Sequence, residues 1–361
     1  MSPRRIAAAA VLTLIAGCGP GSPGPQQSAE APPGEAASRP SEPEVAGDVV
    51  RDLAVPWGVD FLPGGDALVA ERDRARILRV TPAGTVPIGR VPGVEPGGEG
   101  GLLGLAVSPG FASDRQVYVY YSTSNENRIV RMTYQNGGLG APQPVLAGIP
   151  SAVFHDGGRI TFGPDGMLYA GTGDARRPEL AQDRVSLAGK ILRMTPAGDP
   201  APGNPFPGSL VFSYGHRNVQ GLAFDSRGRL WSVEHGADAW DELNLVAPGG
   251  NHGWPVVEGR GGGGQFRQPA VQWPPAEASP SGMAIVDDVI YIAALRGARL
   301  WQVPIVGDGA AEPVPLFAGE FGRLRTVEQA PDGSLWVTTS NRDGRGDPRD
   351  GDDRILRLTT S

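Results

Sequence analysis

The sequence predicts an all-β fold, a six-bladed β-propeller of four-stranded antiparallel blades, and three observations support this. The 361 residues include 54 glycines and 36 prolines, about a quarter of the chain, which argues against an all-helical fold because both residues break helices. Hydrophobic residues make up 40% and charged residues 20%, which excludes a wholly disordered chain. Finally, one strand–turn–strand pattern recurs six times.

Each copy of the repeat has an apolar alternation, a turn that often contains Pro, Asp and Gly, and a second apolar strand. One apolar marker per copy gives steps of 46, 55, 62, 61 and 44 residues, at Val59, Leu105, Ile160, Leu222, Met283 and Val327. A blade of four short strands needs about this many residues, and radial repetition protects the sheet edges. A pair of β-sandwiches or another blade count stays open, because irregular insertions blur the period.

Further strands follow the markers at regular positions. Second strands are expected at 168–170, 230–233, 290–292 and 335–337, and third strands at 77–82, 191–196 and 355–359. No helical periodicity of useful length competes with them. We therefore expect one propeller domain over residues 48–361.

The N-terminus has the features of an export signal. Arg4 and Arg5 precede an apolar run, residues 6–16, that is too short to span a bilayer as a mature helix. Small residues then lead into Cys18, as in the lipobox of bacterial lipoproteins. We expect a signal peptide over residues 1–17 and lipidation of Cys18; an ordinary secretion signal with an incidental cysteine is the alternative.

Residues 18–47 consist mainly of Pro, Gly, Ser, Ala and Glu, which predicts a flexible tether behind the lipidated cysteine. Cys18 is the single cysteine, so the chain forms no internal disulfide and its folded part has no thiol catalysis. We expect an exported protein anchored by lipid to the bacterial cell membrane, with its domain outside the cytoplasm.

The charge balance limits the partners. A net charge of −7 argues against nucleic acid or an anionic membrane surface as the main partner, so the lipid anchor is the one membrane contact expected. The 32 basic residues are 31 arginines and one lysine, Lys190.

A histidine and an aspartate flank one predicted hairpin. His155 precedes the strand–turn–strand segment and Asp174 follows it, so the hairpin returns Asp174 to the neighbourhood of His155. A carboxylate that accepts from one imidazole nitrogen raises the basicity of the other, as a general base requires. The spacing alone does not distinguish this role from a structural contact.

Several motifs resemble those of a known family. They are GEGGLLG at 98–104, HDGGR at 155–159, GHRN at 215–218, the stretch 234–244 and Arg-Leu-Arg at 323–325. Their sequence and order resemble the soluble sugar dehydrogenases that use pyrroloquinoline quinone (PQQ), in particular the aldose sugar dehydrogenase branch. The resemblance covers about residues 50 to 360.

The resemblance implies an enzyme that oxidises aldoses to lactones with PQQ and Ca²⁺ and passes electrons to an external acceptor. It implies that His155 is the base that takes the anomeric hydroxyl proton, oriented by Asp174. It places Arg217, which we also count as catalytic, and Asn218 on the quinone. Backbone carbonyls of Gly236 and Ala237 would hold calcium, which prefers oxygen ligands. Further cofactor contacts are implied at Glu99, Arg296, Arg323 and Arg325.

Three positions depart from the family's glucose enzyme, which has glutamine at Glu99, lysine at Arg296 and proline at Ala237. A carboxylate at Glu99 would repel an anionic quinone unless it were protonated or faced the calcium. Two other function classes therefore stay open, a calcium-dependent propeller hydrolase such as a lactonase and a non-catalytic binding propeller. The segment 341–347 also resembles part of a calcium loop, although Arg345 occupies a ligand position there.

Overall fold

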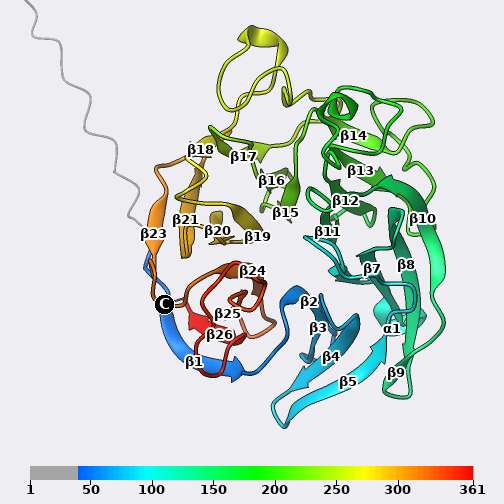
Figure 1. Cartoon of the computed structure of the whole chain (residues 1–361), viewed down its shortest axis with the longest axis vertical. Helices are drawn as coiled ribbons and strands as arrows, with labels where there is room; N and C mark the ends of the chain where they lie inside the picture. The colour runs from blue at the N-terminus through cyan, green and yellow to red at the C-terminus, as the bar shows by residue number, and fades with distance from the viewer. Residues whose placement is uncertain (1–39, 361) are drawn as a thin grey trace, which may run out of the picture. The chain divides into compact units, whose positions relative to one another are not determined.

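The computed structural model describes residues 40–360, which fold into six antiparallel sheets around one central axis (Figure 1). The expected signal peptide, Cys18 and the tether up to residue 39 lie outside the described residues. Within residues 40–360, no helix has the length and apolar character needed to cross a membrane. The six-bladed all-β prediction is confirmed.

One strand from each sheet lines the central axis. These innermost strands are β2 (Pro56–Phe61), β6 (Leu102–Val107), β11 (Gly157–Phe162), β15 (Val219–Phe224), β19 (Pro280–Val286) and β24 (Leu324–Gln329). Each contacts its counterpart in the next sheet, and β24 contacts β2, which closes the ring. Every marker residue of the predicted repeat lies in one of these six strands.

The other strands pair outward in order. The second strands are β3 (Ala67–Glu71), β7 (Gln116–Ser122), β12 (Leu168–Thr172), β16 (Leu230–Glu234), β20 (Val289–Ala294) and β25 (Leu335–Thr339). The third strands are β4 (Arg76–Thr81), β8 (Glu126–Gln135), β13 (Lys190–Met194), β17 (Asp241–Leu245), β21 (Arg299–Val306) and β26 (Ile355–Thr359).

The outermost strands are β5 (Gly84–Arg90), β10 (Gln143–Pro150), β14 (Val211–Tyr214), β18 (Val271–Trp273), β23 (Val314–Leu316) and β1 (Glu44–Val50). Two short strands, β9 (Gly138–Leu139) and β22 (Gly309–Ala310), extend two of the sheets. Three single-turn helices interrupt the loops, namely α1 (Phe111–Asp114), η1 (Pro178–Ala181) and η2 (Gly263–Gln265).

The sixth sheet joins the two ends of the domain. Its outer strand, β1, pairs antiparallel with β26 in a register that runs from Glu44 opposite Thr359 to Val50 opposite Ile355. The N-terminal strand thereby pairs with the C-terminal strand of the domain and becomes the outer strand of the last sheet. Strand β1 starts at Glu44, so residues 44–47, which composition assigns to the tether, are part of the last blade.

The predicted Pro, Asp and Gly turns lie between innermost and second strands. Asp165 and Asp332 each accept the backbone N–H two residues ahead, at 3.0 Å, which is the bond of an Asx turn. The glycines that follow them, Gly166 and Gly333, have φ angles of +73° and +84°. Glycine adopts this left-handed region without a steric cost, which explains its place in the turns.

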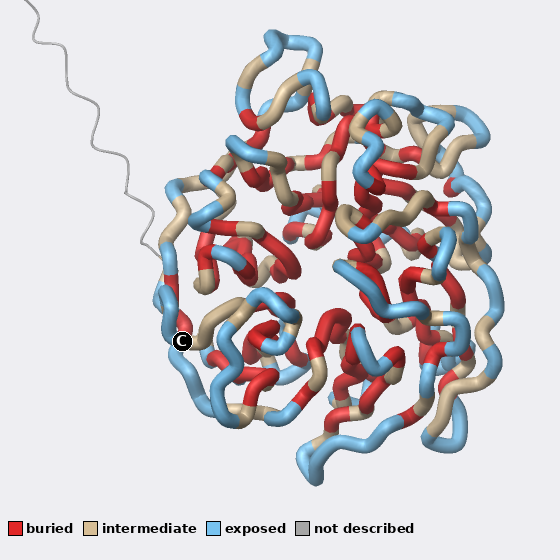
Figure 2. The backbone as a smooth tube through the Cα atoms, viewed as in Figure 1, coloured by how far each residue is buried: buried red, intermediate tan, exposed pale blue. Residues whose placement is uncertain are grey.

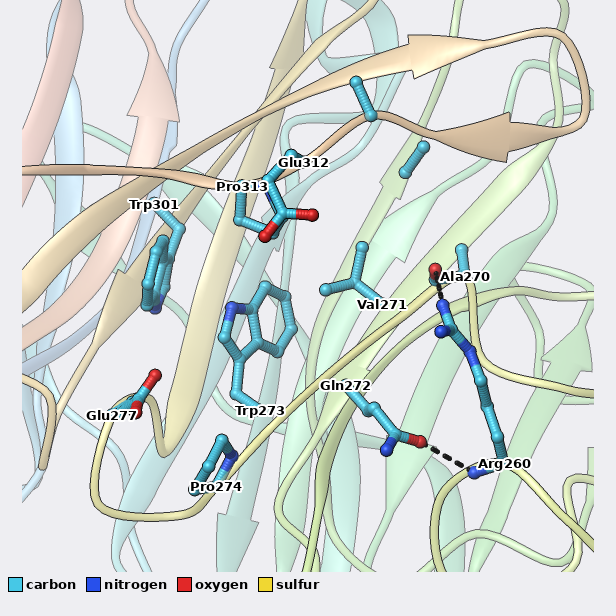
Figure 3. A pocket seen from close by; sticks show the side chains of 12 residues that line it. Arg260, Ala270, Val271, Gln272, Trp273, Pro274, Glu277, Trp301, Glu312 and Pro313 are labelled. Atoms are coloured by element: carbon cyan, nitrogen blue, oxygen red, sulfur yellow. Dashed lines mark hydrogen bonds between the residues drawn. The ribbon is translucent and has the colours of Figure 1, made fainter.

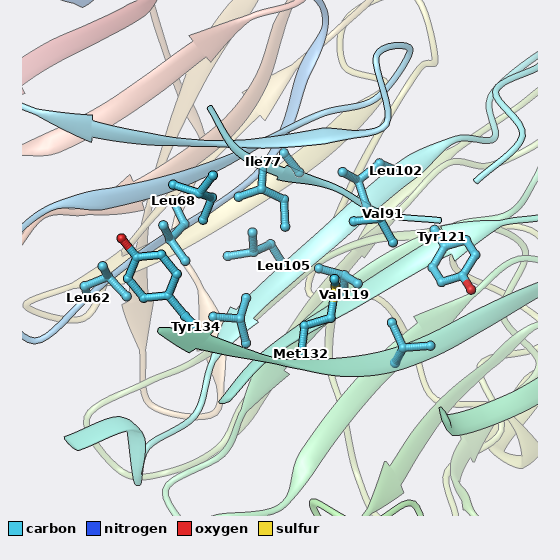
Figure 4. Close-up of a cluster of buried hydrophobic side chains, with 14 of the residues drawn as sticks. Leu62, Leu68, Ile77, Val91, Leu102, Leu105, Val119, Tyr121, Met132 and Tyr134 are labelled. Atoms are coloured by element: carbon cyan, nitrogen blue, oxygen red, sulfur yellow. The ribbon is translucent and has the colours of Figure 1, made fainter. Parts of the chain in front are cut away.

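Apolar layers between neighbouring blades hold the ring together. Buried residues are concentrated in the inner strands, whereas the loops and outer edges are largely exposed (Figure 2). Figure 4 shows the layer between the first two blades, where Leu68 and Ile77 pack against Leu102, Val119 and Met132. Burial of such side chains stabilises each by about 1.5–3 kcal/mol, so the contacts between blades are a main source of stability.

The Leu68→Ala variant should lower the free energy of unfolding by about 2–5 kcal/mol, because it leaves a cavity in this layer. Val86→Ala in β5 of the same blade is the matched control, since Val86 is 55% exposed. Chemical denaturation monitored by tryptophan fluorescence measures both variants. Equal unfolding midpoints for the two would contradict this account of the blade interface.

Candidate active site

The predicted site residues lie at one end of the ring. In each blade the innermost and second strands are antiparallel. The loop before the innermost strand and the loop after the second strand therefore lie at the same end of the blade. The residues before or at the start of an innermost strand are Glu99, His155, Arg217, Asn218, Arg323 and Arg325. Those after a second strand are Asp174, Gly236, Ala237 and Arg296.

His155 and Asp174 are hydrogen-bonded, with 2.8 Å between Nδ1 and Oδ1. Asp174 is 1% exposed and also accepts the indole N–H of Trp254 at 2.9 Å and the backbone N–H of Arg176 at 2.8 Å. These donors fix the carboxylate, which in turn orients the imidazole. A proton on Nδ1 leaves Nε2 as the basic nitrogen, and Nε2 has no hydrogen-bond partner in the described part of the chain.

The backbone of His155 is held in a left-handed conformation, with φ +68°. Its N–H donates to Glu99 Oε2 at 3.0 Å, and its carbonyl accepts the N–H of Ala175 at 3.2 Å. Gly173 permits this approach, because a Cβ there would lie 1.7 Å from the His155 oxygen. Such a conformation in a residue other than glycine is costly and is maintained by its surroundings, as is common at functional sites.

Lys190 closes the loop that carries Asp174. The side chain is fully buried, and its ammonium donates to the carbonyls of Leu180, Ala181 and Ala188 at 2.7, 3.0 and 2.6 Å. Burial lowers the pKa of Lys190 to about 7. Three carbonyls around one point suit a compact ammonium better than a planar guanidinium, which accounts for a lysine in a chain otherwise rich in arginine.

The GHRN motif is held from behind by a buried carboxyl group. Glu234 lies 2.7 Å from Nδ1 of His216 and accepts the backbone N–H of Arg217 at the same distance. Burial lowers the pKa of His216 to about 3, so its ring is neutral, and Nε2 lies 2.8 Å from the Ser213 hydroxyl. His216 therefore supports the loop that carries Arg217 and Asn218.

Cationic and amide side chains at this end have unused donors. Arg217 lies over the Trp254 ring at 5.4 Å, and Arg325 lies over Trp57 at 5.9 Å. Nε of Arg217, Nδ2 of Asn218 and Nε of Arg325 are buried without a partner in residues 40–360. Burial, with other arginines nearby, lowers the pKa of Arg325 to about 9, so it stays charged at neutral pH. Unpaired buried donors are costly, so an anion with several oxygens fits here.

Asp343, which lies 3.6 Å from a terminal nitrogen of Arg325, binds another predicted arginine more closely. Arg323 donates through Nε and one terminal nitrogen to Oδ2 of Asp343, at 3.1 and 2.9 Å, and is therefore already paired. Arg296 is exposed and forms no hydrogen bond or ion pair with the rest of the described chain. Its neighbour Leu295 lines the cavity at the channel mouth, so Arg296 is near the site without contacting it in this structure.

Two carboxylates bind the backbone N–H groups of the loop after β16. Glu258 Oε1 accepts the backbone N–H groups of residues 237–240, at distances of 2.6–3.1 Å, and Asp241 accepts that of Gly236. The carbonyls of Gly236 and Ala237 accept no hydrogen bond within residues 40–360. Backbone carbonyl oxygens are ligands that a hard cation such as Ca²⁺ accepts.

Several residues of the site were not assigned from the sequence. The cavity at the channel mouth is also lined by Trp57, Asp156, Gln220, His235 and Arg345. Gln220 is two residues beyond Asn218, so strand alternation could have identified it. Burial lowers the pKa of His235 to about 3, which leaves it neutral. Nothing in the sequence places Arg345 near Glu99, 246 positions away.

Larger cavities lie elsewhere. One of them has a volume of about 280 Å³ and is lined by Trp273 and Trp301 together with Glu277 and Glu312 (Figure 3). Another, of about 300 Å³, lies in the channel at the opposite ends of the innermost strands, beside Asp60, Arg159 and Glu328. Neither contains the His155–Asp174 pair or the arginines that surround it.

The chain is similar to known sugar dehydrogenases. A family model described as glucose/sorbosone dehydrogenase matches residues 53–356. The PQQ-bound structure of aldose sugar dehydrogenase from Streptomyces coelicolor is 55% identical, with a TM-score of 0.86, and the match covers 88% of this chain and 99% of that one.

Two further matches come from Escherichia coli. The apo structure of soluble aldose sugar dehydrogenase is 27% identical, with a TM-score of 0.78, over 89% of this chain and 99% of that chain. Aldose sugar dehydrogenase YliI is 29% identical over 337 residues, which cover 82% of this chain and 90% of the relative.

The Lys190→Met variant should lower the free energy of unfolding by about 3 kcal/mol or more, because three carbonyls lose their donor. Lys190→Arg should not restore it, since a planar fork does not meet three converging oxygens. Arg227→Met, at an exposed position, is the control. Chemical denaturation curves measure the free energy of unfolding of each variant. A Lys190→Met variant as stable as wild type would contradict the role given to this lysine.

Proposed function

Because the chain belongs to the glucose/sorbosone dehydrogenase family, we propose that it oxidises aldose sugars to lactones with PQQ and Ca²⁺. It is an oxidoreductase of the PQQ aldose sugar dehydrogenase type. The observation that carries the proposal is the His155–Asp174 pair, whose Nε2 has no partner in the described chain, at the same end as the unpaired donors of Arg217 and Arg325. PQQ in the Streptomyces relative supports the cofactor assignment.

The proton-transfer step belongs to His155. Nε2 takes the proton of the anomeric hydroxyl, and Asp174 stabilises the imidazolium through Nδ1. When bound, PQQ supplies the two-electron acceptor for the anomeric hydride, and an external acceptor later takes the electrons. The fixed position of Asp174 keeps the ring oriented, so little reorganisation accompanies the transfer.

Side chains around the channel are suited to hold the cofactor. Arg217, Arg325 and Asn218 would donate to its carboxylate and carbonyl oxygens, because Nε of each arginine and Nδ2 of Asn218 lack a partner in the described chain. The carbonyls of Gly236 and Ala237 would hold calcium, since the N–H groups of their loop are bound by Asp241 and Glu258. Arg323 and Arg296 would contribute positive charge nearby.

Dye reduction by purified full chain tests the function. Activity should require PQQ, calcium and an aldose together, and removal of calcium by a chelator before PQQ is added should abolish it. His155→Ala should lower kcat by about 10²–10⁴-fold while PQQ still binds, because a general base contributes about that factor. Val86→Ala, at an exposed position of β5, is the control and should keep the wild-type kcat.

The outcomes separate the function classes. Absence of dye reduction with every aldose, together with no spectral change from bound PQQ, would overturn the proposal. Lactone hydrolysis without PQQ would favour a hydrolase, and neither activity would favour a binding propeller. A fully active His155→Ala would remove the histidine from the mechanism.

We also propose export and lipid anchoring at Cys18, on the sequence alone. The anchor would place the domain outside the cytoplasm, where the sugar and the acceptor would meet it. Cys18→Ser should move the protein from the membrane fraction to the soluble extracytoplasmic fraction. Retention of the variant in the membrane fraction would contradict the anchor.

A further inference from the structure

Glu99 brings a negative charge to the mouth of the channel. Its side chain is 22% exposed and lines the cavity that Arg325 and His235 also line. Burial raises the pKa of Glu99, whereas the backbone N–H of His155 and the charge of Arg345 lower it, and the pKa lies below its usual range. Glu99 is therefore ionised at neutral pH, although the proposed cofactor is itself an anion.

This carboxylate cannot easily turn away. Oε2 accepts the His155 N–H at 3.0 Å and so supports the left-handed backbone of that residue. The backbone is fixed as well, because Glu99 donates its own N–H to the carbonyl of Val153 at 2.9 Å. A Cβ on the preceding Gly98 would lie 2.0 Å from that carbonyl, so the segment is tightly packed.

Arg345 is the cation that faces Glu99. A terminal nitrogen of Arg345 lies 3.0 Å from Oε1, and its guanidinium lies over the ring of Phe154 at 5.3 Å. The loop that carries Arg345 comes from the sixth blade, whereas Glu99 precedes the second blade. The backbone N–H of Arg345 donates to Asp343, which also binds Arg323, so the loop has a defined geometry.

We propose that Arg345 is a cofactor-site residue that neutralises Glu99 and thereby allows an anionic quinone to bind beside a carboxylate. The inference rests on the proposed function. An exposed ion pair usually contributes little to stability. Here the pair matters for binding instead, because an uncompensated carboxylate would repel every anion that approaches the channel mouth.

A double-mutant cycle tests the inference. PQQ is titrated into purified apoprotein with calcium, and its dissociation constant is followed by absorbance, for wild type, R345Q, E99Q and E99Q/R345Q. R345Q should weaken PQQ binding about ten- to a hundredfold, because the charge of Glu99 is then unopposed. E99Q should bind at least as tightly as wild type, since its amide oxygen can still accept the His155 N–H. The double variant should recover most of the loss.

Arg357→Gln is the matched control. Arg357 pairs with Asp332 at 2.7 Å at the opposite end of the same blade. The substitution therefore changes the net charge by the same amount as R345Q and leaves the site unaltered. Its PQQ affinity should equal that of wild type. Thermal unfolding of each apoprotein shows whether a weak binder is folded, and R345Q should retain a wild-type melting temperature within a few degrees.

The outcomes distinguish this inference from the proposed function. If wild type does not bind PQQ, the proposed function itself fails. If wild type binds and R345Q binds equally well, or if R345Q and the double variant lose the same affinity, charge compensation by Arg345 is wrong. Weaker PQQ binding by E99Q alone would also overturn the inference, because the carboxylate would then favour cofactor binding and not oppose it.

Discussion

Antiparallel pairing inside each blade brings the start of every innermost strand and the end of its neighbour to the same end of the ring. The site depends on this constraint, because no blade alone supplies a base, cationic donors and free carbonyls. His155 and Asp174 belong to the third blade, Arg217 and Ala237 to the fourth, and Arg325 to the sixth. Closure of the ring by β1 and β26 keeps these loops in one frame, so the propeller acts as a rigid support for residues that are remote in sequence.

The site also concentrates unfavourable features that the rest of the fold must stabilise. His155 has a left-handed backbone, Glu99 is an ionised carboxylate beside it, and Arg325 is a buried cation. Each has a specific support. Backbone N–H groups and glycines hold His155, Arg345 pairs with Glu99, and Asp343 with the Trp57 ring supports Arg325. The blade interfaces supply the stability against which these costs are set.

Much of this arrangement could be predicted from the sequence because it is local. The repeat markers identify the innermost strands, and the hairpin between His155 and Asp174 is short enough for its ends to be placed by counting. The start of β1 was missed because Glu44–Gly47 has the composition of a tether, and its strand conformation comes from pairing with β26, more than 300 residues away. The Arg345–Glu99 pair is equally non-local. In the sequence, Lys190 is notable as the single lysine, and the fold is needed to identify its three carbonyl partners.

The central claim is that His155 removes the proton of an anomeric hydroxyl while the bound cofactor is reduced. Its most direct test is a single-turnover experiment, in which full chain loaded with PQQ and calcium is mixed with an aldose or with its methyl glycoside, which has no free anomeric hydroxyl. We expect the aldose to change the absorbance from that of the oxidised cofactor to that of the reduced cofactor, and the glycoside to leave it unchanged. Equal reduction by both sugars, or the same rate of reduction in His155→Ala, would contradict it.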